Sequence, residues 1–290
     1  MQLPLILVTN DDGIDSAGLW AVAEALLTVG EVLVVAPNRQ WSGGGRSMPP
    51  TVTGEITPYV RDLDGQRVLG YAVDASPALA VQHGVLELAS RRPSLVVSGV
   101  NYGYNLANEV TISGTVGAAL EGAAFGIPSM ALSLEMDPRY HLQGNADADY
   151  TAVQAFAGRF AQHLLSFPLP YNVDALNINF PADATPDTPW RLTRLSRQRY
   201  FCPVAPNRAE GQGRPGYKLL DDPMQTRTDS DIWAVQVERI VSVTPISLDL
   251  TAHTDLGQMQ DDLQAGVEAS AQCLDALSTL FSAPMEAAVP

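Results

Sequence analysis

Leu5-Ile-Leu-Val-Thr9, followed at once by Asn10-Asp-Asp-Gly13, is the stretch that decides the fold. A short continuous apolar run that ends in a polar cluster is typical of a strand buried on both faces of a parallel sheet. Apolar residues then recur at helical spacing from 19 to 27, and Gly30 stands where a helix C-cap is expected. Because Val32-Leu-Val-Val-Ala36 forms a second such run, the chain opens with a βαβ unit whose crossover is right-handed.

The alternation of apolar strands and amphipathic helices continues to about residue 180. Strands are expected near Thr51–Val60 and at Arg67–Val73, Leu95–Ser98, Ser129–Leu134 and Ala175–Phe180, and helices at Pro77–Leu88, Gly114–Phe125 and Tyr150–Ser166. This order of elements predicts an α/β fold with a mostly parallel sheet between two helical layers. Residues 1–180 are therefore expected to form one α/β core of this kind.

The composition changes after this core. Residues 181–231 are rich in Pro, Gly, Arg and Asp and contain only brief apolar stretches, so this segment is a poor core element and a candidate for an extended arm or hairpin that reaches a neighbouring subunit. Trp233–Ile240 and Ile246–Leu250 are predicted as returning strands, and Leu256–Phe281 as a C-terminal helix. We assign 232–290 to the same domain as the core.

Composition and charge limit the classes of partner. The chain has 290 residues and a formal net charge of −15, which disfavours nucleic-acid polymers and anionic membranes because these are bound by clusters of Lys and Arg. Cys202 and Cys273 lie far apart and form no metal-binding spacing. We see no membrane-spanning run and no basic, apolar leader, so the expected location is the cytoplasm.

The first polar loop, Thr9-Asn-Asp-Asp-Gly-Ile14, contains an adjacent pair of carboxylates. Asp11 and Asp12 at a buried strand end repel each other, and a hard divalent cation with a preference for oxygen ligands removes that conflict. Taken alone, such a pair is more often one helix cap and one carboxylate that faces water. Asp11 and Asp12 alone therefore do not predict a metal site, and the prediction depends on two further polar loops.

Two further polar loops follow strands that are expected beside the first. Ser42, Gly43 and Gly44 lie after the second strand, where the hydroxyl can reach a metal and glycine amides can approach an anion. Asn101 ends the strand at Leu95–Ser98 and offers a neutral oxygen. Ser113, Gly114 and Thr115 open a helix whose free amides favour a phosphate, although a flexible turn and ordinary helix capping explain these segments equally well in isolation.

Together the three loops predict one site, because ligands of open parallel sheets bind beyond the carboxyl ends of the strands. Asp11, Asp12, Ser42 and Asn101 are the four predicted ligands of a single divalent cation. The phosphate is expected to contact Gly43, Gly44, Ser113, Gly114 and Thr115. A metal beside an anion-binding helix start suits hydrolysis of a phosphate ester, with Asp11 or Asp12 orienting or deprotonating the attacking water.

Several longer motifs carry a family resemblance. They are Thr9-Asn-Asp-Asp-Gly-Ile14, Ala36-Pro with Ser42-Gly43, Ser98-Gly-Val-Asn-Tyr-Gly-Tyr-Asn105, Ile112-Ser-Gly-Thr-Val-Gly-Ala-Ala119, Gly126-Ile-Pro-Ser129 and Ser242-Val-Thr-Pro245. In this order they resemble the SurE (survival protein E) family of metal-dependent 5′/3′-nucleotidases. The match covers roughly residues 5 to 245.

The resemblance implies a SurE-like fold, in which residues 1–180 form a Rossmann-like, three-layer α/β/α catalytic core and residues 181–231 an extended hairpin arm exchanged between subunits. The resemblance further implies a homodimer or homotetramer, and Mn²⁺ or Mg²⁺ held by the four predicted ligands. It also implies hydrolysis of nucleoside 5′-monophosphates, with 3′-monophosphates and short polyphosphate as further substrates. The chain departs from the family pattern at Asn38 and Trp41, where Asp and Arg are usual, and at Leu79, where Asp is usual. These departures concern substrate preference, since all four ligand positions are kept.

Three other classes of protein share some of these sequence features. A SurE-like protein that binds nucleotide with little or no catalysis remains the alternative, because of Asn38 and Trp41. A receiver module requires a phospho-accepting Asp and a Lys after later strands, which the sequence lacks, and a dinucleotide-binding oxidoreductase requires GxGxxG after the first strand. The four histidines, His141 among them, show no spacing that supports a catalytic role.

Overall fold

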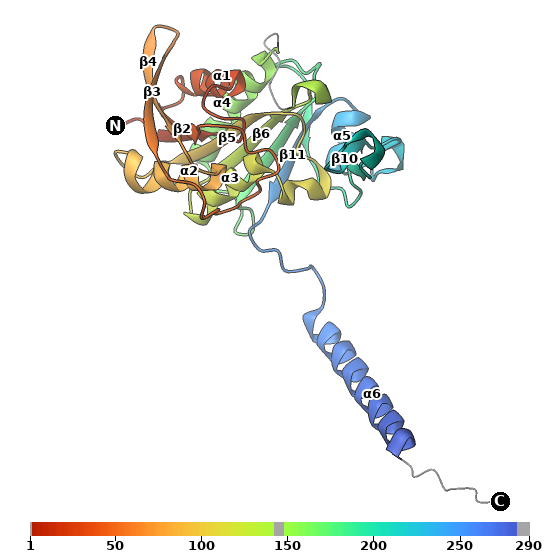
Figure 1. The fold of residues 1–290 in the computed structure, drawn as a ribbon. Helices are drawn as coiled ribbons and strands as arrows, with labels where there is room; N and C mark the ends of the chain where they lie inside the picture. Colours follow the sequence, from red (N-terminus) through yellow and green to blue (C-terminus); the bar gives the residue numbers. More distant parts are fainter. Residues whose placement is uncertain (1, 142–147, 283–290) are drawn as a thin grey trace, which may run out of the picture. The chain divides into compact units, whose positions relative to one another are not determined.

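The computed structural model describes residues 2–141 and 148–282 (Figure 1). Its main sheet has nine strands in the order β3-β4-β2-β1-β5-β6-β7-β11-β8. The strands are, in chain order, β1 Leu5–Thr9, β2 Glu31–Pro37, β3 Ile56–Leu63, β4 Gln66–Val73, β5 Leu95–Tyr102, β6 Ser129–Leu134, β7 Ala175–Phe180, β8 Trp190–Leu192 and β11 Val241–Ile246. All neighbours are parallel except β3 with β4 and β7 with β11, which confirms the predicted α/β fold.

Helices cover both faces of the sheet, as the periodicity predicted. On one face, α1 (Ala17–Leu26) and α4 (Thr151–Ser166) bury Trp20 and Phe156 in a core with Ile6. On the other face lie α3 (Gly114–Ala124) and α2 (Pro77–His83), which continues as a π-helical turn to residue 88. Alternate residues of β1 face the two layers, and this explains why the whole strand is apolar.

The topology places a switch point at β1. From β1 the chain crosses to β2 on one side, whereas β5 pairs with β1 on the other side. The loops that leave the carboxyl ends of β1, β2 and β5 therefore diverge around a crevice. Such crevices are the binding positions of open α/β sheets, so the topology brings the three polar loops to one edge.

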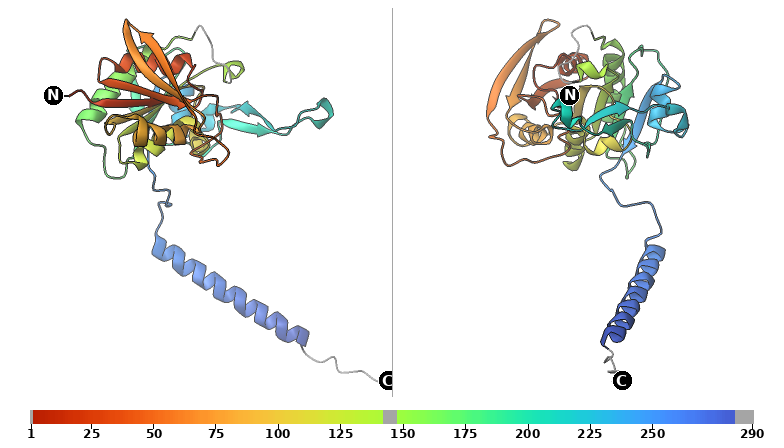
Figure 2. Two further views of the ribbon diagram at one scale, coloured as in Figure 1. Left: turned by 60° about the vertical axis from the view of Figure 1, so that its left-hand side comes forward. Right: turned by 45° about the vertical axis from the view of Figure 1, so that its right-hand side comes forward.

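The segment 181–231, predicted as an arm, contributes β8 to the main sheet and also contains a separate hairpin. Two antiparallel strands, β9 (Phe201–Val204) and β10 (Gly216–Leu219), make a hairpin that projects from the core in the left view of Figure 2. The root of the arm is tied to the core by Asp231, which is buried and accepts hydrogen bonds from the backbone N–H of Ala107 at 2.6 Å and of Ser196 at 2.9 Å. The base of the hairpin is thereby placed beside the loop that follows β5.

The region after the arm differs from two of the sequence predictions. The predicted strand at Trp233–Ile240 is wrong: α5 (Asp231–Gln236) occupies this segment, with the Ser230 side chain accepting from the N–H of Trp233 as its N-cap. The strand predicted at Ile246–Leu250 is also wrong, because β11 ends at Ile246. The returning element is therefore one helix followed by one strand.

The C-terminal helix α6 (Leu256–Ser282) is present as predicted. The chain divides into two compact units, residues 1–248 and 249–290, so the structure groups α6 apart from the core with which the prediction had combined it. No helix among residues 2–141 and 148–282 combines the length and apolar character needed to cross a bilayer.

Candidate metal centre

Asp11 follows β1 directly and is held from three sides. Its side chain is buried, with a relative exposure of 4% for the residue. The Thr115 hydroxyl donates to Asp11 Oδ1 at 2.5 Å, and the backbone N–H of Trp41 donates to the Asp11 carbonyl at 2.7 Å. A Cβ atom at Gly114 would lie 2.7 Å from the Asp11 Cβ, so only glycine lets α3 begin this close to the carboxylate.

Asp12 is oriented by a side chain and a backbone amide. Gln40 Nε2 donates to Asp12 Oδ1 at 3.2 Å, and the N–H of Tyr102 donates to Asp12 Oδ2 at 3.3 Å. The same Gln40 nitrogen donates to the carbonyl of His141 at 2.9 Å. Residues from the loops after β2 and β6 and from the end of β5 therefore converge on this one carboxylate.

The two carboxylates lack a counter-charge from the protein. Burial raises the pKa of Asp11, and the pKa of Asp12 is raised well above its usual value by burial and then by the negative charge of Asp11. Among the described residues, no Lys or Arg forms an ion pair with either carboxylate. A bound cation would relieve the repulsion at neutral pH, so this pair fits a metal.

The predicted ligands converge on one cavity. Asp11, Ser42 and Asn101 line a cavity of about 510 Å³, and Asp12 adjoins it through its bond with Tyr102, which lines the same space. Asn101 Nδ2 donates to the carbonyl of Gly103 at 2.7 Å, which leaves the amide oxygen available to a cation. Ser42 is exposed in the loop after β2, where its hydroxyl can reach the same space.

A bulge in β5 aims Asn101. The pairing of β5 with β6 shifts between Ser98 and Asn101, and Gly99 has a φ of 129° at this point. A side chain at Gly99 would meet the Leu132 carbonyl at 2.4 Å, so the bulge requires glycine here. The motif Ser98-Gly-Val-Asn101 thus bends the strand end toward Asp12.

The donor set defines the kind of cation. In the part of the chain that the structure describes, no three His, Cys, Asp or Glu side chains gather to hold a metal. A cation at this site would therefore be held by two carboxylates and neutral oxygen atoms. Oxygen ligands of this kind suit a hard cation such as Mg²⁺ or Mn²⁺ rather than Zn²⁺, which prefers nitrogen and sulfur.

Two of the five predicted phosphate contacts line the same cavity. Gly43 and Ser113 line it, whereas the N–H of Gly44 is used within its own loop, donating to the Trp41 carbonyl at 2.9 Å. Ser113 also caps α3 by accepting from the N–H of Val116 at 3.1 Å. The Thr115 hydroxyl is used on Asp11, so it positions a predicted ligand, and the phosphate contacts of these residues stay predictions.

Comparisons with known proteins identify the family of the chain. The family model described as survival protein SurE matches residues 6–201. The chain belongs to the SurE family. A 5′-nucleotidase SurE of Thermococcus gammatolerans is 42% identical over 259 residues, covering 89% of this chain and 95% of that protein. A 5′-nucleotidase SurE of Methanocella arvoryzae is 41% identical over 257 residues, covering 85% and 93%.

A solved structure shows the same fold. The crystal structure of the SurE protein from Aquifex aeolicus is similar with a TM-score of 0.67 and 30% identity, covering 89% of this chain and 98% of that one. The SurE-like architecture predicted from the motifs is thereby confirmed. The four predicted ligands and their roles stay predictions, which the observed convergence supports.

The departures from the SurE pattern leave the four predicted ligands in place. Asn38 is exposed, and its N–H pairs with the Val73 carbonyl at 2.8 Å. The Trp41 ring centroid lies 5.3 Å from the Arg39 guanidinium carbon, in cation–π contact. Leu79 packs against the core on the α2 side of the sheet. The second loop of this SurE chain thus has an aromatic surface where the family usually has a cation.

Sequence reasoning missed the arm and His141 as parts of the site. Phe201 and Tyr217 from the hairpin, together with His141, line the cavity that contains Asp11, Ser42 and Asn101, which we call the metal cavity. His141 Nε2 donates to the Met136 carbonyl at 2.9 Å, and burial lowers the pKa of the imidazole, so the ring is neutral. Its Nδ1 therefore accepts from the Tyr217 hydroxyl at 3.0 Å, which connects the hairpin to the loop below it.

Proposed function

We propose that this chain is a metal-dependent phosphomonoesterase that hydrolyses nucleoside 5′-monophosphates to nucleoside and phosphate. The observation that carries the proposal is the convergence of Asp11, Ser42 and Asn101 on one cavity, with Asp12 held beside them. Relatives about 40% identical are named 5′-nucleotidase SurE, and this supports the same reaction here. Nucleoside 3′-monophosphates and short polyphosphate are further candidate substrates.

Different residues of the chain would bind the metal, position its ligands and stabilise the charge on the phosphate. Mn²⁺ or Mg²⁺ held by the four predicted ligands would polarise a phosphoryl oxygen and lower the pKa of a bound water. Thr115 fixes the Asp11 carboxylate, and Gln40 fixes that of Asp12, so neither has to reorganise during the reaction. The N-terminus of α3 adds a positive field where negative charge develops on the phosphate.

The assembly and the compartment are also part of the proposal. The projecting hairpin supports exchange of the arm between subunits of a homodimer or homotetramer. The net charge of −15 supports a small-molecule substrate rather than a nucleic-acid polymer. We place the reaction in the cytoplasm.

A phosphate-release panel tests the proposal. Purified full-length protein is assayed with AMP, GMP, a 3′-monophosphate and tripolyphosphate, each in the presence of Mn²⁺, Mg²⁺ or EDTA. We expect release from 5′-monophosphates with Mn²⁺ or Mg²⁺, and loss of that release with EDTA. Tight nucleotide binding without release from any substrate would replace this function by the non-catalytic, nucleotide-binding alternative.

A further inference from the structure

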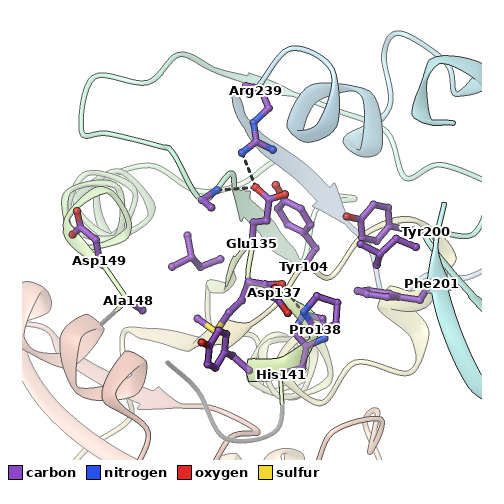
Figure 3. Close-up of a pocket in the computed structure, with 15 residues that line it drawn as sticks. Tyr104, Glu135, Asp137, Pro138, His141, Ala148, Asp149, Tyr200, Phe201 and Arg239 are labelled. Carbon is purple, nitrogen blue, oxygen red and sulfur yellow. Dashed lines mark hydrogen bonds and ion pairs between the residues drawn. The ribbon is translucent and has the colours of Figure 1, made fainter. Parts of the chain in front are cut away.

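A second cavity adjoins the metal cavity. It has a volume of about 670 Å³ and is drawn in Figure 3. Four residues line both cavities: Tyr104, Pro138, His141 and Phe201. A molecule whose phosphate lies at the four predicted ligands can therefore place its other end in the second cavity.

One side of the second cavity is an aromatic wall, formed by Tyr104, His141, Tyr200 and Phe201. Consecutive rings meet edge to face, with centroids 5.8 Å apart for Tyr104 and Tyr200 and 4.9 Å apart for Tyr200 and Phe201. Each ring is packed against the next, which holds the wall in place, and the ring faces that border the cavity offer flat apolar surface. Such surfaces bind planar heteroaromatic rings by stacking, largely regardless of which base is stacked.

Beside Tyr104 the cavity carries a carboxylate, that of Glu135, with spare acceptor capacity. Glu135 Oε2 accepts from the N–H of Ala182 at 2.9 Å and from Arg239 at 2.7 Å, whereas Oε1 accepts only a long bond of 3.3 Å from Gln236 among the described residues. Burial acts to raise the pKa of Glu135, but the hydrogen bonds from Arg239 and Ala182 outweigh it and lower the pKa. The group is thus an ionised acceptor.

The Tyr104 hydroxyl stands beside this carboxylate. It is buried, and burial first and then the negative charge of Glu135 raise its pKa, with a hydrogen-bonding contact to Glu135 adding to the shift. No other residue that the structure describes forms a hydrogen bond with this hydroxyl. A ligand with one N–H donor next to one acceptor would pair with Glu135 and Tyr104 together. The Watson–Crick edge of a nucleobase has this arrangement.

We propose that the second cavity is the nucleobase subsite, in which the base stacks on the aromatic wall, donates an N–H to Glu135 and accepts from the Tyr104 hydroxyl. The inference rests on the proposed function and extends it to substrate selection. The charges favour a base over a chain of phosphates, because Arg239 is already paired with Glu135 and Asp183, and Asp137 and Asp149 line the space.

The test compares three substrates that differ only in the base. AMP carries the full edge, purine riboside 5′-monophosphate lacks the exocyclic amino group, and ribose 5-phosphate lacks the base. We expect kcat/KM for AMP to exceed that for purine riboside monophosphate by about tenfold, as is typical of a lost hydrogen bond to a charged group. Ribose 5-phosphate should be slower again by about tenfold, because it cannot stack.

Two variants and one control test which residues cause the differences in kcat/KM among the three substrates. Glu135→Gln replaces the charged acceptor by a neutral amide and should reduce the tenfold ratio to about threefold. Tyr104→Phe keeps the ring, so AMP and purine riboside monophosphate should slow equally relative to ribose 5-phosphate. Asp183→Asn alters the other carboxylate that pairs with Arg239, and because Asp183 does not line the cavity it should leave all ratios unchanged.

The outcomes separate the two claims. Equal kcat/KM values for the three substrates, or unchanged ratios in both Glu135→Gln and Tyr104→Phe with native circular dichroism, would overturn the subsite while leaving the phosphatase intact. Absence of phosphate release from all three, ribose 5-phosphate included, would overturn the proposed function and the subsite with it.

Discussion

The metal cavity and the second cavity share a wall but are built in opposite ways. Asp11 and Asp12 follow a buried strand directly, and each is fixed by residues from neighbouring strand ends. The second cavity draws Tyr200 and Phe201 from the arm and Glu135 from the loop after β6. In our proposal the metal ligands lie where the sheet topology leaves little freedom, whereas substrate selection is assigned to segments added at the rim.

Removal of one predicted ligand should have the largest effect, and on all substrates alike. Asp12→Asn should lower metal-dependent phosphate release by more than about 10³-fold, since the metal contributes several kcal/mol to transition-state stabilisation. The metal-free variant should unfold at or above the wild-type temperature, because the substitution removes a buried charge that repels Asp11. Wild-type turnover in this variant would mean that Asp12 is not a ligand.

A matched pair of glycines tests the packing of α3 against Asp11. Gly114→Ala places a Cβ atom 2.8 Å from Asp11 Oδ2, so we expect a loss of activity of about 100-fold from displacement of the carboxylate. Gly158→Ala, in α4, meets no atom within 4 Å and should keep full activity while adding about 0.5–1 kcal/mol of stability. Equal activity of the two variants would show that activity does not depend on close packing of α3 against Asp11.

A matched pair of glutamines tests the bridge between the two cavities. Gln40→Met removes the bonds to Asp12 and to the His141 carbonyl, and should weaken metal affinity by about 10-fold. Gln154→Met also removes two bonds, to Ala21 and Glu24, but these lie between α4 and α1. Titration of Mn²⁺ should therefore distinguish the variants, and identical affinities would show that Gln40 does not position Asp12.

The smallest effect on kcat/KM is expected from a substitution of Tyr217, which lies in the hairpin. Tyr217→Phe loses the hydrogen bond to His141 Nδ1, and kcat/KM for AMP should fall about threefold. The exposed Tyr171 provides the control, since Tyr171→Phe changes a side chain outside both cavities. If Tyr217→Phe reduced Mn²⁺ affinity as strongly as Gln40→Met, the division of labour between core and arm would be wrong.

The sequence predicted the core well because the core depends on local patterns, and the candidate metal ligands follow strands of that core. Apolar runs such as Leu5–Thr9 specify buried strands, and the Asp11–Asp12 pair follows one directly. The region after the arm was harder, since Trp233–Ile240 is apolar enough for a strand, and the structure alone shows Ser230 as the N-cap of a helix. His141 and Tyr217 are 76 residues apart in sequence, and no periodicity indicates that a hairpin will bring them together.

The central claim is that three separate loops hold one hard cation. Anomalous diffraction at the manganese edge, from crystals grown with Mn²⁺, tests it most directly. The account predicts one peak at the edge of the sheet, within about 2.5 Å of oxygen atoms from all four predicted ligands. A well-occupied manganese ion bound elsewhere, with the side chains of Asp11, Asp12 and Asn101 pointing apart, would contradict it.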